Sequence, residues 1–207
     1  MDISQVSAIE RLRGGLIVSC QAREGSPFRS TSIMVAMAKA AEISGAVGIR
    51  ADGHDDISGI RSATDLPIVG IYKRRGLPGC DVYITPTFED ARIVASAGAD
   101  VIAVDGTSRK RPNGETLKAL IERIHNELQL PVMADCSTEE EGLLAAEFGA
   151  DLVATTLSGY TEHTKHKLDK GPDVDLLKGL VNKLKVPVVA EGRFNEPEDV
   201  SRALDLG

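Results

Sequence analysis

Cysteine is scarce in this sequence of 207 residues, which has Cys20, Cys80 and Cys136 far apart and odd in number. Such spacing argues against a disulfide framework and against a cysteine-based metal site, and it fits a reducing compartment. We therefore expect a cytoplasmic protein.

Long apolar runs and an excess of positive charge are also missing. No uninterrupted apolar run approaches the roughly 20 residues that span a bilayer, and residues 1–15 lack the apolar core of a signal peptide. The formal net charge is −7, whereas nucleic-acid-binding domains are normally basic. We expect neither a membrane nor a nucleic acid as partner, although an anionic small molecule would need only local positive charge.

The chain does contain seven short, continuous apolar runs that predict strands. Continuous runs are typical of parallel strands covered on both faces. The predicted strands span residues 15–21, 46–51, 67–73, 101–106, 131–136, 152–156 and 187–191.

Segments with apolar residues at helical spacing lie between these runs, at 31–44, 115–128, 138–149 and 174–184. Ser137 followed by Glu140 predicts a capping box at one helix start. Strict alternation of strands and helices with short loops indicates parallel strands and right-handed crossovers. No linker divides the chain, so we expect one domain over residues 1–207.

Polar residues stand at the carboxyl end of almost every predicted strand, while the first strand is not followed by the G-x-G-x-x-G turn of a dinucleotide fold. A ring of functional groups from successive strand ends is typical of a (β/α)8 TIM barrel, whose site lies at that face. The ring consists of Gln21, Arg50, Lys73, Asp105, Asp135, Thr156 and Glu191.

The sequence accounts for seven βα units, whereas a full barrel of this type has about 250 residues. An open parallel edge favours aggregation. We therefore expect a C-terminally incomplete record, lacking the eighth strand and helix, rather than an open barrel.

Lys73 and Glu191 are the strand-end groups with the most obvious chemistry. At the mouth of a barrel, partial burial, and Arg74 and Arg75 if they point inward, would lower the pKa of Lys73, so that it acts as a base or a Schiff-base nucleophile. Alternatively, it is a solvated surface lysine. Glu191 is either a proton acceptor or a local partner of Arg193.

Gly192 lets the backbone approach a ligand, and backbone N–H groups in such a turn can hold a phosphate. The basic run 105–115 either steers an anionic substrate or is an ordinary solvated loop. His163 and His166 lie in a polar segment, and no histidine or cysteine stands at ligand spacing from Asp105 or Asp135. We expect no metal.

Seven ordered motifs, "VSCQA", "GIRA", "PIVGIYKR", "YITPT", "DGTSRKRP", "ADCST" and "AEGR", resemble those of N-acetylmannosamine-6-phosphate 2-epimerases over about residues 13–207. This family interconverts N-acetylmannosamine 6-phosphate and N-acetylglucosamine 6-phosphate in bacterial sialic-acid breakdown. The resemblance implies a phosphorylated amino sugar as substrate, a homodimer, and no metal or organic cofactor.

The resemblance also implies the roles of the site residues. It implies that Lys73 and Glu191 are catalytic. It also implies that Gln21, Arg50 and Asp135 contact the sugar. Gly192 and Arg193 then hold the phosphate, and we count Thr156 among the substrate contacts. The family's eighth strand, with a Gly-x-Ala-Ile-Thr-Arg-Pro-type segment, has no counterpart in this sequence.

Two alternatives stay open at this point. One is a related phosphosugar isomerase or decarboxylase barrel. The other is a non-catalytic phosphosugar-binding protein, if the chain is truly truncated.

Overall fold

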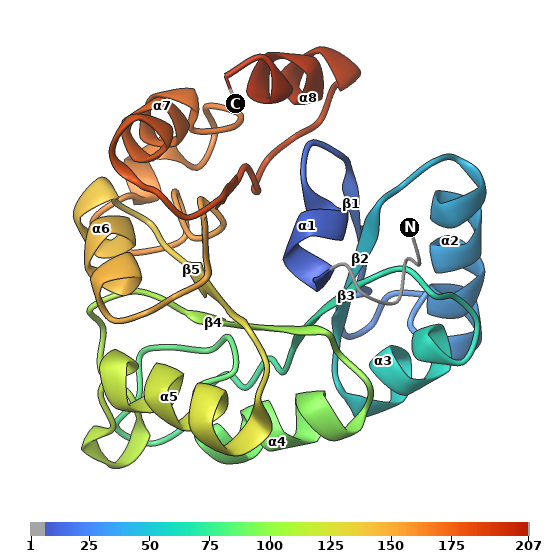
Figure 1. The fold of residues 1–207 in the computed structure, drawn as a ribbon, viewed down its shortest axis with the longest axis horizontal. Helices are drawn as coiled ribbons and strands as arrows, with labels where there is room; N and C mark the ends of the chain where they lie inside the picture. Colours follow the sequence, from blue (N-terminus) through green and yellow to red (C-terminus); the bar gives the residue numbers. More distant parts are fainter. Residues whose placement is uncertain (1–6, 207) are drawn as a thin grey trace. The chain divides into compact units, whose positions relative to one another are not determined.

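Strands and helices alternate through residues 7–206, the part of the chain that the computed structural model describes (Figure 1). The start of the N-terminal segment and the expected helix-ending glycine at position 207 lie outside it. The chain forms two compact units. The first contains residues 7–74 and 84–103, and the second residues 75–83 and 104–206.

The first unit carries the N-terminal strands and helices. Its strands are β1 (Ile17–Cys20), β2 (Gly48–Asp52), β3 (Ile68–Ile71) and the beginning of β4 (Val101–Asp105). Its helices are α1 (Ala8–Leu12), α2 (Thr31–Ile43), α3 (His54–Arg61) and α4 (Phe88–Ser96).

The second unit carries the end of β4 and all later elements. Its further strands are β5 (Val132–Asp135), β6 (Leu152–Ala154) and β7 (Val188–Val189). Its α-helices are α5 (Leu117–Arg123), α6 (Glu139–Glu147), α7 (Val174–Lys183) and α8 (Pro197–Leu204). Shorter helical segments are η2 (Pro112–Gly114), η3 (Ile124–Leu128) and η4 (Lys165–Lys167).

The sheet follows chain order from β1 to β7. In the first unit Ile17 pairs with Gly48 and Ile49 with Ile68, both in parallel register. In the second unit Met133 pairs with Leu152, also in parallel register. Parallel strands in chain order with helical crossovers are the topology of a (β/α)8 barrel. The predicted fold class is confirmed, with seven strands in residues 7–206.

Most apolar strand residues are buried in both units because helices cover them. In the first unit, α2 and α3 contact each other and the strand β2. In the second, α6 contacts β5, β6 and α7. Fully buried side chains include Ile49, Ile57, Ile60, Ile68, Val69 and Ile71 in the first unit, and Leu120, Ile121, Ile124, Val132 and Val153 in the second.

One capping box lies one residue later than predicted. Thr138, not Ser137, is the N-cap of α6, and its hydroxyl accepts a hydrogen bond from the backbone N–H of Glu141. The Glu141 carboxylate accepts one in return from the Thr138 N–H. The prediction of Ser137 and Glu140 was wrong because the serine is also bonded to Glu141, through both its N–H and its hydroxyl.

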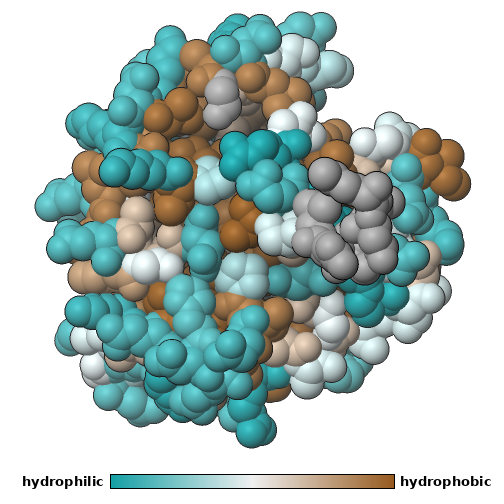
Figure 2. Space-filling view, viewed as in Figure 1, coloured by the Kyte–Doolittle hydropathy of each residue, from teal (hydrophilic) through white to brown (hydrophobic). Residues whose placement is uncertain are grey.

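The predicted helix 115–128 is divided. It begins at Leu117, with Thr116 as the N-cap, and changes to the π-helix η3 at Ile124. No helix within residues 7–206 is long and apolar enough to cross a membrane. Figure 2 shows hydrophilic side chains over much of the face in view.

Candidate functional site

Lys73 follows β3 and is held by two partners from β1 and β2. Its Nζ donates a hydrogen bond to Oε1 of Gln21 over 2.5 Å. Its backbone N–H donates to Oδ1 of Asp52 over 2.9 Å, and Nζ lies 3.9 Å from Oδ2 of the same carboxylate. An isolated antiparallel bridge to Ile84 fixes the backbone. The amine is therefore positioned at the carboxyl ends of three neighbouring strands.

The orientation of Gln21 is set by Ser19. The side-chain N–H of Gln21 donates to the Ser19 hydroxyl over 2.7 Å, which directs the amide oxygen to Lys73. Ser19 also pairs in register with Arg50, whose side chain is buried within β2. The sequence predicted Gln21 and Lys73 as site residues but missed Asp52, because β2 extends to Asp52, beyond the predicted strand end.

The two arginines after Lys73, expected to influence its amine, each contact another side chain. The guanidinium of Arg74 lies 3.1 Å from the carboxylate of Asp90, which is fully buried. The guanidinium of Arg75 lies over the ring of Tyr83, 4.0 Å from its centroid. Both cations are thus engaged with side chains other than Lys73.

A second group of predicted residues meets in the other unit. The Thr156 hydroxyl contacts Oδ1 of Asp135 at 2.6 Å and Oε2 of Glu191 at 3.3 Å. Asp135 ends β5 and is fully buried. The three side chains come from the ends of three successive strands, so parallel pairing brings Asp135, Thr156 and Glu191 together as expected.

Thr155 fixes the backbone of Glu191. Its hydroxyl accepts from the Glu191 N–H over 3.0 Å and donates to the Glu191 carbonyl over 2.9 Å. This role was not predictable from sequence, since Thr155 and Thr156 look alike as neighbours at a strand end. The two adjacent threonines thus make different contacts: Thr155 bonds to the backbone of Glu191, whereas Thr156 contacts its carboxylate.

Gly192 and Arg193 form a turn with positive φ angles of 105° and 61°. The guanidinium of Arg193 donates to the carbonyl of Gly171 over 2.6 Å and to that of Ser158, and it lies 5.8 Å from the Tyr160 ring. A Cβ on Gly159 would lie 2.5 Å from this guanidinium. Arg193 therefore ties the loop between β6 and α7 to the turn after β7.

The basic run after β4 is turned inward rather than fully solvated. Arg109 contacts the buried carboxylate of Asp105 at 2.6 Å, and Arg111 donates to the Asp105 backbone carbonyl. Burial raises the pKa of Asp105, while Arg109 and the hydrogen bonds from Thr107 oppose the rise. Burial likewise lowers the pKa of Arg111. These charges therefore stabilise the loop itself.

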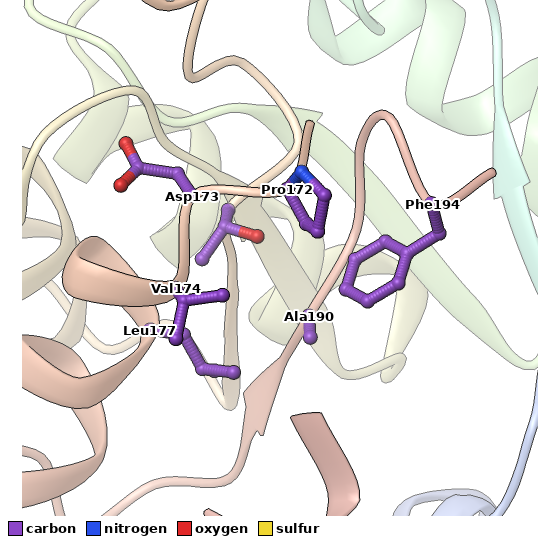
Figure 3. Close-up of a pocket in the computed structure, with 7 residues that line it drawn as sticks. Pro172, Asp173, Val174, Leu177, Ala190 and Phe194 are labelled. Carbon is purple, nitrogen blue, oxygen red and sulfur yellow. The ribbon is translucent and has the colours of Figure 1, made fainter. Parts of the chain in front are cut away.

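A small, mostly apolar pocket lies beside β7 and the start of α7 (Figure 3). In this view the ring of Phe194 is directed towards Ala190 and Pro172, whereas the Asp173 carboxylate points away. The pocket contains none of the predicted site residues. Its lining residues are Thr155, Pro172, Asp173, Val174, Leu177, Ala190 and Phe194.

Comparison with a family model matches residues 34–207 to the family described as "Putative N-acetylmannosamine-6-phosphate epimerase". A relative from Caldanaerobacter subterraneus subsp. tengcongensis, named "Putative N-acetylmannosamine-6-phosphate 2-epimerase", is 47% identical over 98% of this chain and 85% of its own length. A relative from Cutibacterium acnes with the same name is 49% identical over 96% of this chain and 86% of its own length.

Solved structures show the same similarity. The N-acetylmannosamine-6-phosphate 2-epimerase from Clostridium perfringens superposes with a TM-score of 0.93 at 45% identity, covering 98% of this chain and 87% of that one. A thiamine phosphate pyrophosphorylase from Pyrococcus furiosus, with a TM-score of 0.62 and 19% identity, covers 96% and 84% and shares the fold alone.

Proposed function

The chain belongs to the N-acetylmannosamine-6-phosphate epimerase family, and we propose that it is a carbohydrate epimerase that inverts carbon 2 of N-acetylmannosamine 6-phosphate. The product is then N-acetylglucosamine 6-phosphate, its epimer at that carbon. One observation carries the proposal: in a chain 45% identical to the Clostridium perfringens epimerase, Lys73 and Glu191 are each held by hydrogen-bonding side chains at strand ends.

The reaction requires acid–base groups. Carbon 2 lies next to the aldehyde of the ring-opened sugar, so its proton is acidic and its removal leaves an enolate-like intermediate. Inversion needs removal from one face and return to the other. Each positioned acid or base contributes about 10²–10⁴ in rate.

Lys73 is proposed as the principal acid–base group. Its contact with Gln21 and its pairing with Asp52 restrict the long side chain to one position, which a proton transfer at a fixed carbon demands. Gln21 is also proposed to contact the sugar, since its side-chain amide accepts a hydrogen bond from the Lys73 amine. Arg50, buried in β2, is proposed to orient the sugar.

Glu191 is proposed as the second catalytic group. Thr156 holds its carboxylate, and Thr155 holds its backbone, so Glu191 is fixed at both ends. Asp135 shares the Thr156 hydroxyl and is proposed, with Thr156, to contact the sugar hydroxyls.

The turn at Gly192 and Arg193 is proposed to bind the phosphate through its backbone N–H groups. Loops after the seventh strand commonly do this in barrels, and the positive φ of both residues turns the chain sharply. The Arg193 guanidinium is proposed to support this turn through the carbonyls of Ser158 and Gly171, and to add positive charge near the phosphate.

We further propose a cytoplasmic homodimer. The three cysteines are free thiols, as a reducing compartment would keep them. Light scattering on the purified protein would measure the mass of the assembly. The prediction of one domain over residues 1–207 stays a prediction.

Replacing Lys73 by alanine tests the function. In D2O, the wild-type protein should convert N-acetylmannosamine 6-phosphate to its epimer and introduce deuterium at carbon 2, and Lys73→Ala should do neither at a measurable rate. Lys118→Ala is the matched control, because Lys118 is an exposed lysine paired only weakly with Glu122, at 3.9 Å. Near-wild-type exchange by Lys73→Ala would exclude the proposed role.

A further inference from the structure

Thr85 has a backbone conformation that its own side chain disfavours. Its φ angle is 43°, and it is the one β-branched residue among the non-glycine residues with positive φ in the described part of the chain. A positive φ is unusual for a β-branched residue, and the following Pro86 favours an extended backbone at position 85. The side chain is fully buried. Such a conformation persists only where the surrounding contacts impose it.

Three hydrogen bonds hold Thr85 in this conformation. Its backbone N–H donates to the Tyr72 carbonyl over 2.9 Å. Its hydroxyl oxygen accepts from the Tyr72 N–H over 3.1 Å, and the hydroxyl donates to the Ala103 carbonyl of β4 over 2.7 Å. Thr85 therefore binds both backbone polar groups of Tyr72 and joins them to β4, all within the first unit.

These contacts fix the segment that carries Lys73. Tyr72 and Lys73 lie beyond the end of β3. Thr85 holds Tyr72, and Ile84, the residue before Thr85, forms the isolated bridge to Lys73. The Lys73 N–H donates in addition to Asp52 over 2.9 Å. The backbone that leads to the lysine side chain is thus anchored at the N–H and carbonyl of Tyr72 and at the N–H of Lys73.

We infer that Thr85 is a positioning residue for the reaction: its buried hydroxyl fixes the backbone before Lys73 and thereby the place of the amine. The inference rests on the proposed function, in which that amine exchanges a proton with carbon 2. Thr85 itself transfers no proton. The inference also gives a role to the motif "YITPT", of which Thr85 is the central residue.

A fixed backbone matters here because the lysine side chain is long and flexible. Proton transfer requires the amine within hydrogen-bond reach of its target, and a displacement of about 1 Å at a reacting group can cost about 100-fold in rate. Gln21 and Asp52 act on the charged end of the Lys73 side chain, whereas Thr85 acts on its base. Strained residues cluster at active sites, where the surrounding structure holds them in the required geometry.

Thr85→Val tests the inference, because it keeps the branched shape and removes the hydroxyl. We expect kcat and the rate of deuterium entry at carbon 2 to fall together by about 10- to 100-fold, with KM little changed. Thr85→Ser keeps the hydroxyl and should retain most of the wild-type rate. Each variant is assayed well below its own melting temperature, so that unfolding does not contribute to the loss.

Thr64→Val is the matched control. Thr64 is also buried in the first unit, and its hydroxyl likewise accepts from a backbone N–H, that of Leu66 at 3.2 Å. The same hydroxyl donates to Oε1 of Glu42 at 2.6 Å. Thr64→Val should therefore lower the melting temperature as Thr85→Val does, but leave kcat near the wild-type value.

The outcomes separate this inference from the proposed function. If wild-type protein epimerises the substrate and Thr85→Val has the same kcat as Thr64→Val, the role of Thr85 is wrong and the function stands. A rise in KM alone, or a serine variant as slow as the valine variant, would also overturn the role. If wild-type protein neither epimerises the substrate nor exchanges the carbon 2 proton, both are wrong.

A second variant covers the case in which Thr85→Val does not fold. Thr85→Ala differs from Thr85→Ser only in the hydroxyl, so the ratio of their kcat values measures the same contribution, and we again expect about 10- to 100-fold. An alanine variant that is also unfolded would show that the hydroxyl serves the fold as a whole, which would contradict the inference.

Discussion

The hydroxyl of Thr156 serves two carboxylates, although a threonine hydroxyl carries only one proton. Its contact with Asp135 is short at 2.6 Å, and that with Glu191 is longer at 3.3 Å. The proton is therefore directed mainly to Asp135, and the contact with Glu191 is the weaker of the two. Small movements at Thr156 should consequently change both acidic groups together.

Thr156→Val should lower kcat/KM by about 10- to 150-fold, which corresponds to the roughly 1.5–3 kcal/mol of a hydrogen bond to a charged group. The isosteric side chain keeps the packing, so the melting temperature should change much less than the activity. Thr156→Ser restores the hydroxyl and should recover most of the rate. Equal losses in the valine and serine variants would contradict a role for the hydroxyl.

The three thiols should differ in reactivity. Cys20 and Cys136 are fully buried, and burial raises the pKa of both, that of Cys136 well above its ordinary value. Cys80 is partly accessible. Because the thiolate is the reactive form, a disulfide reagent should modify Cys80 first in the native protein, and Cys80→Ser should remove the fast phase. A fast phase that persists in Cys80→Ser would contradict this.

At the scale of elements, α7 depends on Asp173. Its carboxylate accepts hydrogen bonds from the Leu176 N–H, the Ser158 hydroxyl and the Lys167 amine at 3.2, 2.6 and 2.7 Å. One residue therefore caps the helix and holds the preceding loop. Burial alone would raise the pKa of Asp173, but the bonds from Lys167, Ser158 and Leu176 outweigh it and lower the pKa.

Asp173→Ala should reduce the free energy of unfolding by about 1–2 kcal/mol, the usual cost of losing an N-cap. The pH dependence has a definite sign. Because the folded-state pKa lies below the unfolded value of about 3.9, the carboxylate stabilises the fold above that pH, and this stabilisation is lost as the pH falls through the folded-state pKa.

Denaturant unfolding at neutral and acidic pH checks this prediction, with Asp173→Asn as the control. Asparagine keeps a capping oxygen but cannot carry the charge that pairs with Lys167. The difference in stability between wild-type protein and Asp173→Asn should therefore shrink as the pH falls below about 4. A difference that grows in acid would contradict the assignment.

The sequence was sufficient for the strands because their apolar runs are continuous and bounded by glycine or proline. All seven predicted runs contain the observed strands or overlap them, and β1, β3 and β7 are each three residues shorter than predicted. Helix details were less predictable. Thr138 and Ser137 both suit an N-cap, and both hydroxyls contact Glu141, but only that of Thr138 accepts a hydrogen bond from its backbone N–H.

In the candidate site, too, some residues could be predicted from the sequence and others could not. Strand-end positions led to the prediction of Lys73, Asp135, Thr156 and Glu191 as site residues, because the carboxyl ends of parallel strands are where barrels carry such groups. The supporting residues were missed. Asp52 depends on where β2 ends, and Thr155 depends on its hydrogen bonds to the backbone of Glu191. Contacts between distant segments leave no periodic pattern in the sequence.

At the scale of the whole molecule, burial is uneven along the sheet. Every residue of β3, β5 and β6 is buried, whereas both residues of β7 are only half-buried. The helix α8 has no buried residue, and Leu204 at its end is half exposed. Few apolar contacts therefore stabilise the last strand and helix of the second unit.

Local opening costs least free energy where buried apolar contacts are fewest. Amide hydrogen exchange followed by mass spectrometry should therefore show fast exchange in α8, intermediate exchange in β7, and the slowest exchange of the second unit in β5 and β6. The substitution Leu204→Ala should leave the protection of β5 unchanged, because the side chain is half exposed. Protection of α8 equal to that of β5 would contradict the argument, since it would require stabilising contacts that residues 7–206 do not supply.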